Sequence, residues 1–332
     1  MDILSIDAAE LRVIEKLLDE CVDELEDVES DSALRRITVL AHELPTRIRA
    51  ALNDYRLERT AALFVISGYI VDQDRVGPTP KHWRHRAEAD TRREEVLLAM
   101  VSSLVGDPFG WSTQQDGRLI HDVIPIQGHE HEQLGSSSET LLTWHTEDAF
   151  HPLRGDFLSF LCLRNPYAAA TTIGYVDALR LPDATRAVLF EDRFHILPDN
   201  SHLPKHNSTD GAEVFSTVEE MHRSPDRVAV LFGDPDQPYM RADPYFMSVD
   251  EGDAEARDAL GEFTEQIDKA MFDLCLADGD IAFLDNFRLV HGRKPFQARY
   301  DGTDRWIKRI NITHDLRKSR ASRPGLANRL IR

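Results

Sequence analysis

The chain has 332 residues, and its 39 Lys and Arg against 58 Asp and Glu give a formal net charge of −19. That excess of negative charge would repel a phosphate backbone, so nucleic acid is not expected as a partner. Hydrophobic residues make up 42% of the chain, which allows a sizeable core and excludes an intrinsically disordered protein. We therefore expect a single domain over residues 1–332, because large β-rich domains often exceed about 200 residues.

The N-terminus and the cysteines predict a reducing, cytoplasmic setting. The first twenty residues are acidic from Asp2 and lack the basic start and apolar core of a secretory signal. No window approaches the roughly 18 consecutive apolar residues that a spanning helix needs, so no membrane association is expected. The three cysteines, Cys21, Cys162 and Cys275, are too far apart to indicate a disulfide framework or a zinc motif.

The first 106 residues are predicted to form a mostly helical buttress. Apolar residues recur there at helical spacing, with Asp7 as a candidate N-cap and Gly106 in the position that a helix C-cap prefers. Pro45 should interrupt the second helix, because proline removes a backbone donor and clashes with the preceding turn. The predicted helices cover residues 7–28, 32–55 and 91–106.

Between residues 107 and 315 the pattern changes to short, β-rich runs separated by turn residues. Strands at this density predict a sandwich or a barrel. Two segments, 177–191 and 251–279, look like helices outside the sheets, the second being long and centred on residues 254–275. Residues 127–139 are predicted to be a mobile loop, and residues 316–332 a C-terminal tail.

Two strong metal ligands lie close together in "LLTWHTEDAF", residues 141–150. On a strand, alternate residues share a face, so His145 and Glu147 should converge on one point. The best candidate for a third ligand is His291 in "GDIAFLDNFRLVHGRKPF". Two histidines and one carboxylate form the facial triad of non-haem Fe(II) oxygenases, which leaves coordination positions open for a cosubstrate and O₂.

A pair of arginines follows in "RWIKRINIT", where Arg305 and Arg309 are four residues apart and so face the same way on a strand. Arg305 comes 14 residues after His291 (305 − 291), and its planar fork would hold one carboxylate of a dicarboxylate bidentately. A second arginine on that face could hold another carboxylate. An enzyme that uses 2-oxoglutarate together with an amino acid needs both.

The stretches "WHTEDAFHP", "GDIAFLDNFRLVHGR" and "RWIKR", in this order and spacing, resemble the clavaminate synthase-like Fe(II)/2-oxoglutarate oxygenases. The resemblance covers roughly residues 75–315 and is greatest to the branch that hydroxylates free amino acids in antibiotic pathways. It implies a double-stranded β-helix, or jelly roll, over residues 107–315. It also implies that Fe(II) is bound by His145, Glu147 and His291.

The resemblance further implies the roles of the residues around the iron. Arg305 would hold the distal carboxylate of 2-oxoglutarate with help from Thr172, and Thr171 is the second choice. The remaining implied contacts are the substrate α-carboxylate for Arg309, the α-amino group for Gln114, and the lid over the substrate for Asp199 and Ser201. With O₂ as second cosubstrate, the expected reaction is hydroxylation of an unactivated C–H bond, at C3 before C4.

The substrate prediction depends on "GDPDQPYMRADPYFM", residues 233–247. Arginine-hydroxylating members of the family place two aspartates one residue apart there. In this chain Asp243 matches the first, and Tyr245 stands where the second would be. One carboxylate still favours a cationic side chain, and the compact ammonium of lysine needs fewer acceptors than a guanidinium. A basic amino acid is therefore expected, either lysine or arginine.

Other interpretations stay open from sequence alone. The same site could serve an asparagine- or glutamine-type hydroxylase, a desaturase or a cyclase, and a jelly roll could survive as an inactive binding protein. The histidines His121, His151 and His314 are expected to be structural or at the rim of the site. The "GHEHE" run at 128–132 is expected to be a solvated loop, and Asp234 with Asp236 a turn.

Overall fold

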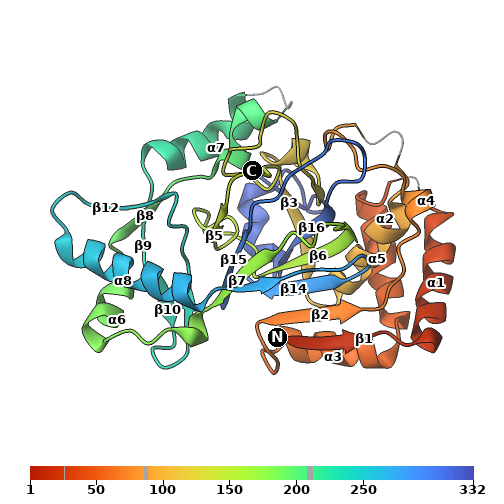
Figure 1. Ribbon diagram of the computed structural model, residues 1–332, viewed down its shortest axis with the longest axis horizontal. Helices are drawn as coiled ribbons and strands as arrows, with labels where there is room; N and C mark the ends of the chain where they lie inside the picture. Colours follow the sequence, from red (N-terminus) through yellow and green to blue (C-terminus); the bar gives the residue numbers. More distant parts are fainter. Residues whose placement is uncertain (26, 86–88, 208–211) are drawn as a thin grey trace.

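A computed structural model of the protein describes residues 1–25, 27–85, 89–207 and 212–332 (Figure 1). Two β-sheets packed face to face form its centre, and helices cover the outer face of each. The predicted jelly-roll core with flanking helices is confirmed. Among these residues, no helix is both long and apolar enough to cross a membrane.

The larger sheet carries both termini as well as the core strands. In spatial order its main path is β1 (Asp2–Ser5), β2 (Leu63–Ser67), β14 (Ile281–Asp285), β6 (Phe157–Arg164), β16 (Trp306–Thr313), β3 (Asp107–Trp111) and β17 (Leu330–Ile331). A further strand, β4 (Ile120–Val123), pairs with β16. The strand β16, which follows Arg305 and contains Arg309, therefore lies within this sheet and is fixed on both sides.

The smaller sheet carries the two histidines of the predicted triad. Its order is β13 (Phe272–Leu274), β7 (Thr171–Tyr175), β15 (Leu289–Arg293) and β5 (Leu142–His145). Two minor sheets complete the β structure: β12 (Met247–Val249), β8 (Phe194–Ile196) and β9 (Arg227–Val228) form one, and β10 (Leu231–Gly233) with β11 (Pro238–Met240) form the other.

The helices divide into two groups on either side of the sheets (Figure 1). The N-terminal group is α1 (Ala8–Val22), α2 (Asp31–Leu40), α3 (Thr46–Arg56), α4 (Gln73–Val76) and α5 (Arg92–Ser103), with α5 packed on β6 and β16. The second group is α6 (Asp183–Leu189), α7 (Ala212–Arg223) and α8 (Ala254–Ala270), with α8 packed on β7. Short 3₁₀ helices are η1 (Ala41–Glu43), η2 (Gln115–Gly117), η3 (Val176–Ala178), η4 (Asn200–His202), η5 (Pro204–His206) and η6 (Leu316–Ser322).

The interior between the sheets is apolar and closely packed. Leu158 and Cys162 of β6 meet Ile173 of β7 and Leu289 of β15, and all four side chains are fully buried. Burying a side chain of this size stabilises a fold by about 1.5–3 kcal/mol. This shared core fixes the distance between β15, which bears His291, and the β16 strand of the arginines.

The N-terminal third differs in part from its prediction. Helix α1 begins where expected, with Asp7 and Glu10 forming a capping box. The description as mostly helical omitted β1 and β2, which pair with each other and join the larger sheet. Helix α5 ends at Ser103, so Gly106 is not its cap; a Cβ at Gly106 would lie 2.5 Å from the Thr313 carbonyl oxygen.

The long helix predicted for residues 251–279 is also shorter than expected. Helix α8 ends at Ala270, and residues 272–274 form β13 instead, paired with β7. The break near Pro45 is confirmed, since α2 ends at Leu40 and Pro45 precedes α3. Hydrophobic periodicity alone could not place the end of α8, because the short apolar run after it fits a helix and a strand equally well.

Candidate active site

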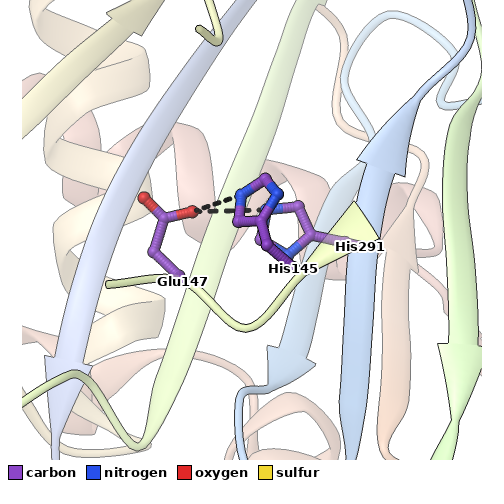
Figure 2. A group of neighbouring side chains, drawn as sticks. All are labelled: His145, Glu147 and His291. Atoms are coloured by element: carbon purple, nitrogen blue, oxygen red, sulfur yellow. Dashed lines mark ion pairs between the residues drawn. The ribbon is translucent and has the colours of Figure 1, made fainter. Parts of the chain in front are cut away.

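Two histidines and a glutamate converge at the edge of the smaller sheet (Figure 2). His145 ends β5 and lies directly opposite His291 in the antiparallel pairing with β15. The Nε2 atoms of His145 and His291 lie 3.6 and 3.3 Å from Oε2 of Glu147, and the two ring centroids are 4.6 Å apart. The three side chains that the sequence analysis selected as ligands are therefore brought together.

The path of the chain to Glu147 differs from the prediction of one continuous strand. Strand β5 ends at His145, and the Thr146 amide donates to the Ala242 carbonyl oxygen (2.7 Å). The Glu147 amide then donates to Oδ1 of Asn286 (2.9 Å), whose Nδ2 donates back to the Glu147 carbonyl oxygen (3.1 Å). Asn286 thus holds the backbone of the turn that carries the carboxylate, a role that its sequence context did not indicate.

The donor atoms fit a divalent metal ion. Nδ1 of His145 donates to the Thr143 carbonyl oxygen (2.8 Å), which leaves Nε2, on the side of Glu147, as the atom that a metal ion can bind. Oε2 of Glu147 is buried and accepts no hydrogen bond from the described residues. A buried carboxylate oxygen without a donor is costly unless a cation neutralises it. Two imidazoles and one carboxylate are the ligand set that suits Fe(II).

The charges around this group keep the carboxylate ionised. Although burial opposes it, the Arg309 guanidinium together with the two histidines holds the pKa of Glu147 well below its ordinary value. Burial lowers the pKa of His291 to about 4, so its imidazole is neutral. Burial alone would also lower the pKa of His145, but Glu147 raises it to about 9. A metal ion that binds here would displace the proton between His145 and Glu147.

Arg309 links Glu147 to two further cavity residues. Its Nη1 contacts Oε1 of Glu147, and its Nη2 donates to Nδ1 of His121 (2.7 Å) and Oε1 of Gln114 (3.3 Å). Burial holds the pKa of His121 well below its ordinary value, so Nδ1 can accept while Nε2–H donates to the Arg118 carbonyl oxygen (3.0 Å). His121 is thus not a ligand, as expected, and it orients the guanidinium of Arg309.

The second predicted arginine lies immediately before β16 and faces the same cavity. Arg305 is buried, and its Nη2 donates to Oγ1 of Thr171 (3.3 Å). Its Nε finds no acceptor in the described part of the chain, and burial lowers the pKa of the guanidinium to about 10. A buried cation with unused donors is suited to a carboxylate ligand.

The preference for Thr172 over Thr171 is corrected by this geometry. Side chains alternate along β7, so Thr171 lies on the same face as Ile173 and lines the cavity beside Arg305. Thr172 points to the opposite face, where its hydroxyl lies against Gly292 of β15.

The metal-binding group opens into a cavity of about 170 Å³. The remaining predicted contact residues, Gln114, Asp199, Ser201 and Asp243, all line it, and so does Tyr245. Asp243 is buried, accepts the Tyr245 amide (3.2 Å) and forms no ion pair with any described residue. Burial raises the pKa of Asp243 to about 6. A cation that enters the cavity would find this carboxylate without a counter-ion.

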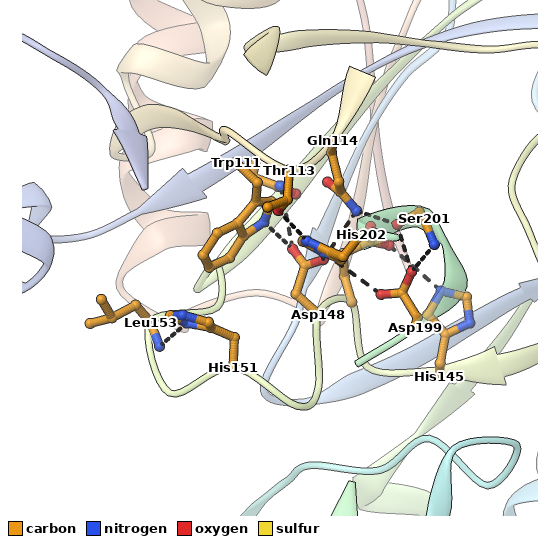
Figure 3. Close-up of polar contacts among 12 residues, drawn as sticks. Trp111, Thr113, Gln114, His145, Asp148, His151, Leu153, Asp199, Ser201 and His202 are labelled. Atoms are coloured by element: carbon orange, nitrogen blue, oxygen red, sulfur yellow. Dashed lines mark hydrogen bonds and ion pairs between the residues drawn. The ribbon is translucent and has the colours of Figure 1, made fainter. Parts of the chain in front are cut away.

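A second group of buried side chains lies beside the cavity (Figure 3). Nε2 of His202 lies 3.0 Å from Oδ1 of Asp148 and 3.8 Å from Oδ2 of Asp199. Burial alone would lower the pKa of His202, but the two carboxylates outweigh it and raise that pKa. No sequence pattern indicates Asp148 or His202, although each is adjacent to a residue predicted for the site.

The other histidine and acidic motifs supply no member of the metal-binding group, although His129 of the "GHEHE" run lines the cavity. His151 is buried with Nδ1 accepting the Leu153 amide (2.9 Å), whereas His314 is exposed and lies against Phe157. The "GHEHE" run supplies no member of either three-residue group found among the described residues. Asp234 accepts the Asp236 amide (2.8 Å) in the turn between β10 and β11, as predicted.

The known proteins that this chain resembles are dioxygenases and amino acid hydroxylases. The family model described as "Taurine catabolism dioxygenase TauD, TfdA family" matches residues 91–311. The L-ornithine/L-arginine 3-hydroxylase of Catenulispora acidiphila is 44% identical, covering 99% of both chains. The enduracididine beta-hydroxylase of Streptomyces hygroscopicus is 45% identical, covering 97% of both. The non-heme iron oxygenase OrfP, solved with Fe, succinate and (3S)-hydroxy-L-Arg, superposes with a TM-score of 0.96 at 45% identity over 99% of both chains.

Proposed function

The chain belongs to the TauD, TfdA family of dioxygenases, and we propose that it hydroxylates a free L-amino acid with a basic side chain. The prediction that the chain is related to clavaminate synthase is confirmed, and so is the prediction that it is an oxidoreductase of this class. The expected cofactors, Fe(II) with 2-oxoglutarate, are confirmed as those of the family, and OrfP has also been solved with Fe and alpha-ketoglutaric acid. The three free cysteines suit the reducing cytoplasm that we propose as its location.

The observation that carries this proposal is the unpartnered Oε2 of Glu147 between two imidazole Nε2 atoms. His145, Glu147 and His291 would hold Fe(II) through these atoms. When bound, the iron supplies the activation of O₂ that couples decarboxylation of 2-oxoglutarate to attack on a C–H bond. The two histidines come from neighbouring strands of the smaller sheet and Glu147 from the turn after β5, so the cavity side is left open to both substrates.

The surrounding residues bind and orient the two organic substrates. Arg305 and Thr171 would hold the distal carboxylate of 2-oxoglutarate, since the guanidinium keeps a free donor there. Arg309 would hold the α-carboxylate of the amino acid, and Gln114 its α-amino group. Asp199 and Ser201, which line the cavity, would cover the substrate and exclude water.

The substrate's side chain is assigned from Asp243. This buried carboxylate lacks an ion-pair partner among the described residues and lies on the cavity wall, so it favours an ammonium or a guanidinium. Tyr245 in place of a second acid leaves lysine, ornithine and arginine as candidates. The names of the two relatives given above, a 3-hydroxylase and a beta-hydroxylase, support attack at C3. C4 stays the second choice.

Anaerobic reconstitution tests this function. The protein is loaded with Fe(II) and 2-oxoglutarate, exposed to O₂ with single free amino acids, and followed by succinate formation and product mass. We expect basic amino acids to accelerate succinate formation and to gain the mass of one oxygen atom. If no amino acid accelerates succinate formation, the proposed function is wrong; a product that instead loses two hydrogens identifies a desaturase.

The side-chain assignment is tested with Asp243→Asn. Removing the charge while keeping the shape should raise KM for a basic amino acid about 10- to 100-fold, as expected for a buried hydrogen-bonded ion pair. Asp236→Asn, in the exposed turn between β10 and β11, is the matched control and should leave KM unchanged. An unaltered preference among Lys, Arg and Asn in Asp243→Asn would contradict the assignment.

A further inference from the structure

His202 is anchored far more deeply than the segment that carries it. The segment of residues 197–207, called the lid here, borders the cavity through Asp199, Ser201 and His206. Within its short helix η4, Asn200 and Ser201 are partly exposed, whereas His202 has an exposed fraction of 0%. Only Pro198 and His202 are buried in this segment, and His202, as the one with a polar side chain, is suited to act as its anchor.

Every polar atom of the His202 ring is used. Nδ1 lies 2.7 Å from Oγ1 of Thr113, and Nε2 lies 3.0 Å from Oδ1 of Asp148 (Figure 3). The ring also packs edge-on against Trp111 and Phe150, with centroids 5.7 and 4.9 Å away. Two hydrogen bonds and two aromatic contacts therefore hold this ring in place behind the lid.

The partner of His202 sits next to an iron ligand. Asp148 follows Glu147 directly and has a positive φ of 52°, a conformation that non-glycine residues rarely adopt. Its Oδ2 accepts the Trp111 indole N–H (2.6 Å) and a bond from Asn311 (3.4 Å). With Oδ1 facing His202, the side chain of Asp148 is held on both sides, and its backbone fixes the turn after β5.

A second connection closes a loop of contacts through Gln114. Its Nε2 donates to Oγ of Ser201 in the lid (2.6 Å) and to Oδ1 of Asp148 (3.4 Å). Its Oε1 accepts from Arg309, which contacts Glu147. The lid is therefore tied to the iron-ligand turn both by His202 and by a residue assigned to the substrate.

We propose that His202 is a positioning residue that latches the lid to the turn bearing Glu147. Its ring is behind the lid and outside the cavity lining, so it acts through Asp148 and Ser201 without touching the substrate. The latch keeps the lid seated, and with it the Gln114 contact to Ser201, before any ligand arrives. Its effect on product formation rests on the proposed function, while its effect on lid motion does not.

The first test measures lid motion in metal-free protein by hydrogen–deuterium exchange over residues 197–207. His202→Leu fills the pocket but removes both hydrogen bonds, so exchange in the lid should rise about tenfold, as expected for losing a bond to a charged group. His202→Gln can still donate to Asp148 and should restore most of the protection. Unchanged exchange in His202→Leu would overturn the latch.

The second test measures coupling in the iron-loaded enzyme. The ratio of hydroxylated amino acid to succinate should fall in His202→Leu, and KM for the amino acid should rise about tenfold while KM for 2-oxoglutarate stays constant. A purely structural loss would lower activity without changing that ratio. An unchanged ratio would therefore refute the positioning role, whereas failure of wild-type protein to hydroxylate any amino acid would refute the proposed function alone.

Two further variants guard against misfolding and nonspecific effects. Thr113→Val removes only the partner of Nδ1 and should give a smaller change of the same sign. His195→Leu is the matched control, since His195 of β8 is also paired with an aspartate, Asp250 (3.1 Å), away from the cavity. Equal lid exchange in His195→Leu and His202→Leu would contradict the latch.

Discussion

Two groups of buried or partly buried histidines and carboxylates lie side by side in this protein and have similar composition. His145, Glu147 and His291 form one, and Asp148, Asp199 and His202 form the other, with the potential ligand atoms of each within 4.8 Å. They differ in whether a buried ligand atom is left without a hydrogen-bond partner in the described protein. Composition and proximity therefore do not identify a metal site; the unused lone pairs do.

In the second group each side chain is held by hydrogen bonds within the protein. Asp148 accepts from Trp111 and His202, and Asp199 accepts both the amide and the hydroxyl of Ser201 (2.8 and 2.5 Å). In the first group, Oε2 of Glu147 is buried without a donor among the described residues. The first arrangement leaves a buried carboxylate oxygen beside two imidazoles for a metal ion, whereas the second is held by the protein's own contacts and can keep a segment in place.

The largest expected effect, on iron content and turnover, comes from replacing one histidine of each group in turn. His145→Ala should lose both iron and turnover, because a two-ligand site neither holds the ion nor neutralises Glu147. His202→Gln should retain a full equivalent of iron. Metal analysis after dialysis, with succinate formation measured in parallel, checks both. Full iron content and turnover in His145→Ala would show that the first group is not the metal site.

The same contrast exists between two buried arginines near the cavity. Arg293 of β15 donates to the Ser138 carbonyl oxygen, the Ser137 hydroxyl and the Thr140 carbonyl oxygen (2.9, 2.8 and 3.0 Å). Arg305 has one such partner, Thr171, in the described chain. The Nε of each guanidinium has no acceptor among the described residues, but both terminal nitrogens of Arg293 hold the protein's own loop, whereas Arg305 has a single contact and is available to a ligand.

Substituting each arginine by lysine should separate these roles. Arg305→Lys loses the bidentate fork and should raise KM for 2-oxoglutarate about 10- to 100-fold with little change in melting temperature. Arg293→Lys should lower the melting temperature by several degrees while changing KM for 2-oxoglutarate less. Titration of succinate formation and thermal unfolding measure the two quantities. A reversal of the two effects would contradict the assignment of Arg305.

The ligand types and the pair of arginines could be predicted from the sequence because their chemistry and spacing are local. "HTE" and "VHGR" state which side chains are available, and "RWIKR" places two guanidinium groups on one face of a strand. The roles of Asn286 and His202 could not be predicted. Each depends on a contact with a residue distant in the chain, 139 positions for Asn286 and Glu147 and 54 for His202 and Asp148.

The choice between Thr171 and Thr172 could not be predicted for the same reason, because it depends on pairing with a strand distant in the chain. A register shift of one position moves every side chain of a strand to the other face, and sequence alone does not give the register of β7. Pairing with β15 sets it: His291 lies opposite Ile173, so Thr171 shares the cavity face. The sequence reduced the choice to two residues, and strand pairing decides between them.

These adjacent threonines provide the smallest and most discriminating test. Thr171→Val removes the hydroxyl that accepts from Arg305, and the loss of one hydrogen bond of about 1 kcal/mol should raise KM for 2-oxoglutarate about fivefold. Thr172→Val, with its side chain on the other face, should leave that KM unchanged, and both variants keep a β-branched residue in β7. A larger effect from Thr172→Val would mean that Arg305 and its cosubstrate use the other face of β7, and the cavity assignment of both threonines would be wrong.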